Sequence, residues 1–370
     1  MRPLLRLHIG TNKTGTTAIQ SALASYRGPG PEILVTDDTL NSARTLNLAF
    51  RERPLRRLVP PGADLAALRA KERARFSAVL AASDRPALMS SEVFTAISDG
   101  AGIDAAVSAA RAHAAELRVL VYVRPPRSYV RSLYQQSLKA RPPRADVAGF
   151  VPRYRDWLGP WLSHPGVDAA EIVGYRPPLV APDAILRDFA GRCELDPDAL
   201  AQHAAARNRG MSLEAAAVLT AWYASRPETG PGGAPATIPQ PVAAAINGFG
   251  DTLDWGFAGP AFERAIAAAS DQTEWIAQLA GEPGFADEPG FAAAVEGPAE
   301  LARIGEGLAE PLAAWLSERH GVRADPARGT PALIDALAAR EPGAGGGLMG
   351  ALRRSPAARR AAALAARLRR

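Results

Sequence analysis

The sequence predicts an α/β fold, a three-layer parallel sheet flanked by helices, with a helical C-terminal half. In the first half of the chain, short apolar runs alternate with stretches of helical periodicity, as parallel βαβ units do. From about Met211 the apolar runs give way to helical patterns, separated by connectors rich in proline and glycine. A chain of 370 residues is also long enough to bury a sizeable core.

Five strands are expected in the first half, with helices between them. The apolar runs predict strands at 4–10, 32–36, 86–92, 117–124 and 169–175. Helical periodicity predicts helices at 16–26, 65–83, 103–116, 127–140 and 182–193, and the segment before 65 reads as a loop rich in arginine and proline. In a doubly wound sheet of this kind, ligands bind at the carboxyl ends of the strands.

The second half is expected to be helical. Its predicted helices are 212–225, 259–270, 271–281 and 304–321. We expect residues 1–340 to form the folded domain, with an α/β core at 1–195 and a helical part at 211–340. Residues 341–370 read as a glycine-rich linker and a basic tail that could touch acidic surfaces.

The charge of the chain argues against nucleic-acid binding. The formal net charge is +5, but the tail carries seven arginines and one glutamate, which leaves residues 1–340 with a net charge of −1. Cys193 is the single cysteine, so the sequence predicts neither an internal disulfide framework nor a cysteine-based metal site. The sequence shows no signal-peptide core and no apolar membrane span, so we expect a cytoplasmic location. The abundance of Ala, Pro, Gly and Arg is typical of a GC-rich, bacterial source.

A loop rich in glycine and threonine follows the first predicted strand. In GTNKTGTT, Gly10 and Gly15 permit a tight turn, while Lys13, Thr14, Thr16 and Thr17 supply donors for a phosphate at a helix N-terminus. The loop does not match the G-x-x-x-x-G-K-[ST] motif, because Thr16 stands in the lysine position and Lys13 lies inside the loop. The alternative is a tight turn with a threonine as helix cap.

A second group of polar residues follows the fourth predicted strand. This strand ends in Arg124, and Ser132 lies near the second turn of the helix that follows. A guanidinium and a hydroxyl suit a second phosphate. A metal-dependent nucleotide hydrolase would more often end such a strand in aspartate, to organise Mg²⁺. The alternative is a surface arginine.

These two segments resemble sulfotransferases that use 3′-phosphoadenosine 5′-phosphosulfate (PAPS). HIGTNKTGTT is similar to their 5′-phosphosulfate-binding loop, and YVRPPRSYVRSLYQQ to their 3′-phosphate-binding segment, with Arg124 and Ser132 at the matching positions. The sequences of the two segments are most similar to bacterial members of this family that are related to carbohydrate sulfotransferases. The resemblance implies a P-loop-like fold, PAPS as donor, no metal, and a carbohydrate or glycolipid acceptor whose site is shaped by the helical part at 211–340.

The resemblance also implies two catalytic residues. Lys13 would contact the departing oxygen, and Glu92, which follows the third predicted strand, would be the base. The alternative interpretation of Glu92 is a glutamate that caps the following helix. His8 is more simply a core histidine, and the other histidines show no metal spacing. Two further interpretations stay open: a nucleotide-dependent P-loop kinase or hydrolase, and a catalytically silent nucleotide-binding protein.

Overall fold

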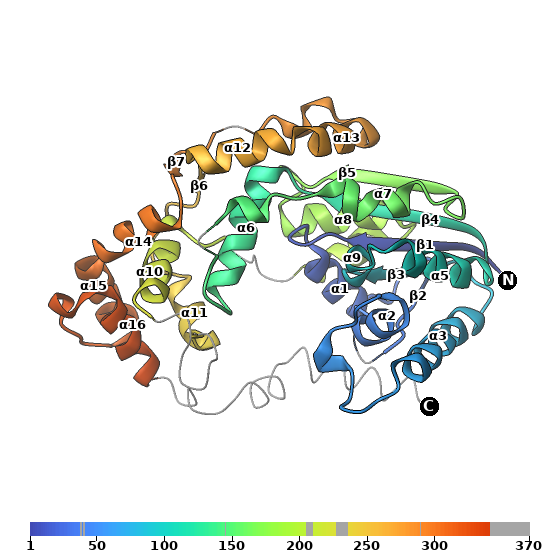
Figure 1. Ribbon diagram of the computed structural model, residues 1–370, viewed down its shortest axis with the longest axis horizontal. Coiled ribbons are helices and arrows are strands. Elements are labelled where there is room, and N and C mark those ends of the chain that lie inside the picture. Colours follow the sequence, from blue (N-terminus) through green and yellow to red (C-terminus); the bar gives the residue numbers. More distant parts are fainter. Residues whose placement is uncertain are drawn as a thin grey trace.

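The first half of the chain folds around a five-stranded parallel sheet, as the sequence predicts (Figure 1). The computed structural model describes residues 1–340 except 38, 40, 145, 205–209, 227–235 and 289, so the predicted linker and basic tail lie outside the described residues. The strands are β1 (Arg2–Gly10), β2 (Glu32–Ile33), β3 (Ala87–Ser91), β4 (Ala114–Val123) and β5 (Ala169–Gly174). Their order in the sheet is β2-β3-β1-β4-β5.

The strand order places β1 at the centre of the sheet, between β3 and β4. Ile9 pairs with Ser91 on one side, and Gly10 pairs with Tyr122 on the other. Because all the strands are parallel, the carboxyl ends of these three strands lie together at one edge. The segments that follow β1, β3 and β4 therefore emerge side by side.

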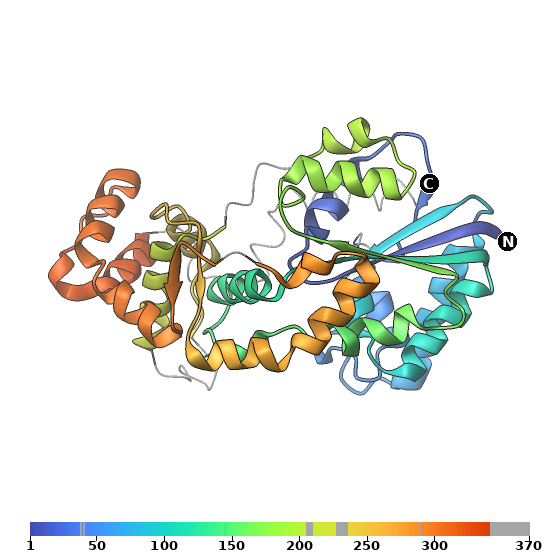
Figure 2. The ribbon, with the colours of Figure 1, turned by 90° about the horizontal axis from the view of Figure 1, so that it is seen from above.

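Helices cover both faces of the sheet, which makes the three layers that the sequence predicts (Figure 2). One face packs against α1 (Thr16–Ser25), α8 (Pro182–Arg192) and α9 (Pro197–Ala201). The other face packs against α2 (Ala43–Phe50), α3 (Leu65–Ala81), α5 (Gly100–Arg111), α7 (Tyr154–Leu162) and α13 (Ser270–Ala280). The side chains of β1 that face this second group of helices recur at every second residue, as the two-residue period of a strand requires: Leu5, Leu7 and Ile9.

A second hydrophobic core holds most of the C-terminal half together. It contains α10 (Leu213–Ala224), α11 (Gln240–Ile246), α14 (Pro298–Glu306), α15 (Ala309–His320) and α16 (Gly329–Arg340). Val130, Tyr134 and Leu138 of α6 (Pro126–Leu138) belong to the same core, so this helix connects the two halves. In the view of Figure 1, α12 (Pro260–Ala268) lies above α6 and leads into α13, which returns to the sheet near β5.

Several predicted elements differ from the structure. The predicted loop before residue 65 contains α2, and the predicted strand at 32–36 is only two residues long. The predicted helix at 103–116 ends at Arg111 because β4 already begins at Ala114. The predicted helix at 304–321 is two helices, α14 and α15, with Gly307 as the C-cap of the first. The mostly helical second half also contains a two-stranded parallel sheet of β6 (Trp255–Phe257) and β7 (Ala293–Val295).

The remaining elements are short. They are α4 (Val93–Ala96) and the 3₁₀ turns Arg56–Leu58, Ala148–Phe150, Pro283–Ala286 and Pro326–Arg328. Across the part of the chain that the structure describes, every helix is too short or too polar to cross a lipid bilayer.

Candidate functional site

The loop from Gly10 to Gly15 joins the central strand to the N-terminus of α1. Gly15 has a φ of 80° and Lys13 a φ of 67°, so two residues take the left-handed conformation within one turn. Gly15 is the N-cap of α1, and no side chain caps this helix end. The alternative of a threonine cap is therefore not what the fold uses. The first amide groups of α1 have no partner within the helix, and they make its N-terminus a suitable place for an anion.

Gly10 is required by close packing at the end of β1. A Cβ atom at this position would lie 2.6 Å from Cγ2 of Thr16, 2.7 Å from Oγ1 of Thr16 and 3.1 Å from Cγ of Glu92. The predicted roles of the two glycines thus differ: Gly15 supplies a backbone conformation, and Gly10 supplies space. The same contacts show that Glu92 lies directly against the loop.

The threonines of the loop are not equivalent. Thr14 and Thr16 are buried, and the Oγ1 hydroxyl of Thr14 donates to the carbonyl oxygen of Thr11 at 2.7 Å. The hydroxyl of Thr16 donates to the same carbonyl at 3.4 Å. These two hydroxyls hold the loop in shape, whereas Thr17 is exposed in the first turn of α1. Of the three hydroxyls that the sequence suggests for a phosphate, that of Thr17 is the exposed one.

Lys13 lies in a cluster of cations. Its Nζ donates to the amide oxygen of Gln136 on α6 at 2.8 Å. Burial lowers the pKa of Lys13 below its ordinary value, the neighbouring cations Lys139 and Arg124 lower it further, and Glu92 opposes them. The chain has only three lysines, and two of them lie here. Sequence reasoning missed Lys139, although the rarity of lysine was a signal that could have found it.

Arg124 connects the end of β4 to the loop. One of its Nη atoms donates to the carbonyl oxygen of Lys13 at 3.1 Å, and its Nε donates to Oγ of Ser128 at 3.2 Å. Its guanidinium lies over the ring of Tyr175, 5.7 Å from the ring centroid. The predicted alternative of a surface arginine does not fit, because the side chain is half-buried and bonded to the loop.

Ser132 lies on the face of α6 that is turned to the loop. Among the described residues, no hydrogen bond joins Ser132 to Arg124. Ser128, Ser132 and Gln136 are spaced four residues apart, so they share one face of the helix. Ser128 contacts Arg124 and Gln136 contacts Lys13, which fixes the direction of this face. Sequence reasoning paired Arg124 with Ser132 and missed Ser128, which carries no distinguishing signal in the sequence.

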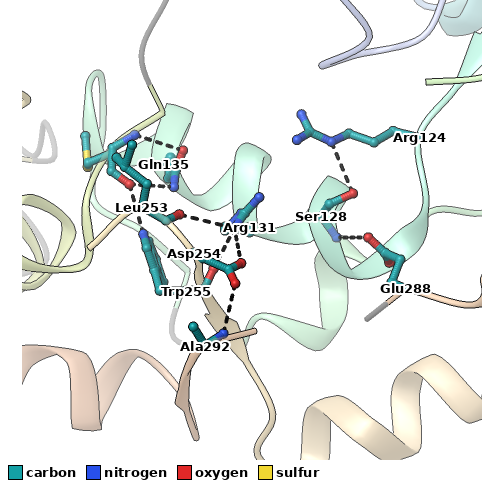
Figure 3. Close-up of polar contacts among 10 residues, drawn as sticks. Arg124, Ser128, Arg131, Gln135, Leu253, Asp254, Trp255, Glu288 and Ala292 are labelled. Carbon is teal, nitrogen blue, oxygen red and sulfur yellow. Dashed lines mark hydrogen bonds and ion pairs between the residues drawn. The ribbon is translucent and has the colours of Figure 1, made fainter. Parts of the chain in front are cut away.

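Segments far away in the chain hold α6 in place (Figure 3). The carboxylate of Glu288 accepts hydrogen bonds from the backbone N–H groups of Arg127 and Ser128 at 2.6 and 2.9 Å, so it caps the N-terminus of α6. Arg131 donates to the carbonyl oxygen of Trp255 at 2.9 Å, and its guanidinium lies over the ring of Phe291. The C-terminal half thereby orients the helix face that carries Ser128 and Ser132.

Glu92 follows β3 as the N-cap residue of α4, but its side chain does not cap that helix. Its backbone N–H donates to Oδ1 of Asn41 at 2.9 Å, and Oδ1 also accepts from Oγ of Ser91 at 2.9 Å. Burial raises the pKa of Glu92, and the cation of Lys13 partly offsets this. The carboxylate is thus left for other chemistry, close to the only lysine of the loop.

His8 is a core residue, as the sequence suggested. It is fully buried, its Nδ1 lies 2.8 Å from Oγ of Ser90, and its ring packs on Phe189. Burial lowers the pKa of His8 to about 3, so the imidazole is neutral at ordinary pH.

A cleft of about 520 Å³ opens beside Glu92. Thr11 and Asn12 of the loop form one side of it, and Arg51, Tyr129 and Trp157 contribute to the other walls. We expected residues 211–340 to shape the second binding site. The cleft next to Glu92 is lined, among the described residues, by residues between Thr11 and Trp157. That residues 211–340 shape the acceptor site stays a prediction.

Within the described parts of residues 1–340, no group of three or more His, Cys, Asp or Glu side chains could hold a metal ion. Comparison of the chain with protein-family models, with curated proteins and with solved structures found no match. The geometry of the site therefore carries the functional argument by itself.

Proposed function

We propose that this chain is a sulfotransferase that moves a sulfuryl group from PAPS to an acceptor hydroxyl of a carbohydrate or glycolipid. One observation carries the proposal. Lys13 lies in the loop that leads to the uncapped N-terminus of α1, Arg124 bonds to this loop and Lys139 lies near Lys13, while the Glu92 side chain lies against the same loop. The cations and the helix end suit a donor with several anionic groups, and the carboxylate suits the activation of a hydroxyl.

The proposed reaction has one displacement step. Glu92 takes the proton of the acceptor hydroxyl while its oxygen bonds to sulfur, and the bond between sulfur and the bridging oxygen breaks. The electron pair of that bond stays on the 5′-phosphate of the departing adenosine 3′,5′-bisphosphate. Lys13 would stabilise this growing charge, which is most effective in a partly desolvated site. The raised pKa of Glu92 makes it a better proton acceptor than an exposed carboxylate.

Recognition of the 3′-phosphate would fall to Arg124 and Ser132. Arg124 is already held by the carbonyl of Lys13 and the hydroxyl of Ser128. A guanidinium fixed in this way loses little freedom when it binds a phosphate. Ser132 is one turn further along the same helix face and could donate to the same group.

A nucleotide-dependent kinase or hydrolase with a P-loop-like site is the alternative. It would also use the N-terminus of α1, but its usual lysine follows the second glycine, where this chain has Thr16. The expectations of a P-loop-like fold, a bacterial source and a cytoplasmic location belong to the same proposal.

Ligand binding separates these functions. In isothermal titrations without Mg²⁺, adenosine 3′,5′-bisphosphate should bind more tightly than adenosine 5′-monophosphate. It should also bind more tightly than ATP does in a separate titration that contains Mg²⁺. At a concentration of about 100 times its dissociation constant, the bisphosphate should stabilise the protein by about 2.7 kcal/mol. Tighter binding of ATP with Mg²⁺ would favour the kinase or hydrolase.

Variants test the phosphate contacts. Arg124→Ala and Ser132→Ala should each lose much of the preference for the 3′-phosphate, and Arg141→Ala, at an exposed arginine just beyond α6, is the matched control. If both site variants keep the wild-type preference, the assignment of Arg124 and Ser132 is wrong. Incubation with labelled PAPS and a cell extract should then transfer the label to an acceptor, and a protein that binds the bisphosphate without any transfer would be the silent binding protein.

A further inference from the structure

Asn41 joins the base of the proposed reaction to other segments of the chain. Its Oδ1 accepts hydrogen bonds from the backbone N–H of Glu92 at 2.9 Å, from Oγ of Ser91 at 2.9 Å and from Nε2 of Gln20 in α1 at 3.2 Å. A backbone N–H can only donate, so the atom that faces Glu92 is the oxygen of the carboxamide. The orientation of the Asn41 side chain is thereby fixed.

The backbone next to Asn41 has an uncommon conformation. Ser42, the N-cap residue of α2, has a φ of 47° and a ψ of 32°, in the left-handed region that residues with a side chain rarely adopt. Two hydrogen bonds hold it there: its Oγ accepts from the N–H of Thr36 at 3.0 Å, and its N–H donates to the carbonyl oxygen of Thr39 at 2.9 Å. Such conformations persist only where the surrounding structure enforces them, and they cluster at functional sites. This turn is therefore built to place Asn41 at the end of β3.

The amide nitrogen of Asn41 is available to a ligand. Among the residues that the structure describes, no acceptor takes a hydrogen bond from Nδ2, whereas Oδ1 has three donors. Asn41 and Glu92 line the same cleft, and Glu92 is the only carboxylate among the described residues of that lining. A neutral hydrogen-bond donor thus accompanies the group that would take a proton.

We propose that Asn41 orients the attacking oxygen: its Nδ2 donates a hydrogen bond to the acceptor hydroxyl, or to a water molecule in its place, while Glu92 takes the proton of that oxygen. This inference rests on the proposed sulfotransferase function, and it adds a residue to the reaction. One lone pair of the oxygen accepts from Asn41, and the other forms the bond to sulfur. Two contacts then set the direction of attack, and such orientation of the reacting atoms lowers the barrier.

Release of labelled sulfate from PAPS in water tests the inference without an identified acceptor. Water attacks sulfur, its proton passes to Glu92, and the products are sulfate and adenosine 3′,5′-bisphosphate. Asn41→Asp keeps an oxygen for the N–H of Glu92 but replaces the donor by an acceptor. The rate should therefore fall about tenfold, as expected for one lost hydrogen bond. Asn41→Ala removes both contacts and should be at least as slow.

The dependence of the rate on pH separates this role from a purely structural one. Among the described residues, Lys13 and Tyr129 are the titratable groups that interact with Glu92, and Arg51 and Arg57 are the other charged groups of the cleft lining. A second carboxylate in this cleft opposes the ionisation of Glu92 and raises its pKa. Because Glu92 must be ionised to act as a base, the acidic limb of the profile should move to higher pH in the aspartate variant, but not in the alanine variant.

Asn47→Asp is the matched control. Asn47 lies in α2, and its Oδ1 also accepts from a backbone N–H, that of Leu55, and from Arg51, both at 3.2 Å. Among the described residues, none of its hydrogen bonds reaches Glu92. This variant should keep the wild-type rate within about twofold, and its acidic limb should not move.

Three results would overturn the inference. They are a wild-type rate in Asn41→Asp, a loss of bisphosphate binding in that variant, and no release of sulfate by the wild-type protein. The first result, together with a slow Asn41→Ala, would make Asn41 a support for the backbone of Glu92 only. Titration of the wild-type protein tests the proposed function separately. If the preference for the 3′-phosphate holds while the Asn41 result fails, the proposed function stands without this role, and if that preference is absent, the proposed function itself fails.

Discussion

Replacement of Gly10 by alanine tests the packing that joins the loop to Glu92. The new Cβ would lie 2.6 and 2.7 Å from two atoms of Thr16 and 3.1 Å from Cγ of Glu92, whereas carbon atoms in contact are usually about 3.5–4.0 Å apart. Gly10 does not have a positive φ, so alanine meets no separate backbone strain. Overpacking of this kind lowers the free energy of unfolding by about 1–3 kcal/mol. Alanine also reduces the entropy of the unfolded chain, which raises the free energy of unfolding by about 0.4–1 kcal/mol. We therefore expect a net loss of about 1–2 kcal/mol.

Urea unfolding followed by circular dichroism measures this loss as a lower midpoint at an unchanged slope. Thr16→Ala removes both crowding atoms of Thr16, so the double variant Gly10→Ala/Thr16→Ala should be more stable than the sum of the two single changes by about 0.5 kcal/mol or more. Gly191→Ala is the control, because this glycine lies in α8 with open space around its Cβ position, and alanine should stabilise the helix. The reasoning fails if Gly10→Ala behaves like Gly191→Ala, or if the double variant is strictly additive.

Three further predictions concern the reaction and the support of α6. Glu92→Gln should lower turnover about 10²–10⁴-fold with little change in bisphosphate binding, and because burial raises the pKa of Glu92 above its ordinary value, the wild-type rate should fall as the pH drops through that raised pKa. Transfer of labelled sulfate over a range of pH checks this, and a wild-type rate in the variant would put the base elsewhere. Lys13→Ala should lower turnover about 10²-fold or more while donor affinity falls less, since its charge acts mainly on the departing oxygen; a variant that loses affinity but keeps its turnover would make Lys13 a binding residue only. Because its neighbours and burial lower the pKa of Lys13, the wild-type rate should also decline in alkaline solution before an exposed lysine would titrate. Glu288→Gln should lower the free energy of unfolding, measured by thermal unfolding, by about 1 kcal/mol, because the N-terminus of α6 loses an anionic cap. Asp287→Asn, at the exposed neighbouring residue, should not have this effect, and equal effects of the two changes would argue against the capping role.

The sequence by itself determined the features that depend on short stretches of chain. The alternation of apolar runs and helical patterns predicted five parallel strands, and all five are present. The position of Gly10 and Gly15 predicted a tight loop at a helix N-terminus, and the structure has one, with the left-handed conformation at Gly15. Helix α2 escaped prediction because it has only eight residues and depends on burial of residues such as Leu46 and Phe50 for its stability.

Only the tertiary structure decided which residues meet. Parallel pairing brings β3 and β4 to the two sides of β1, although they come about 80 and 110 residues later in the chain, and no local periodicity encodes such a pairing. This order sets Glu92 and Arg124 on either side of Lys13. Likewise, the partners of the site on α6, Ser128 and Gln136, are ordinary surface residues by sequence. They become part of the site because distant segments, among them Glu288, fix the position and the direction of that helix.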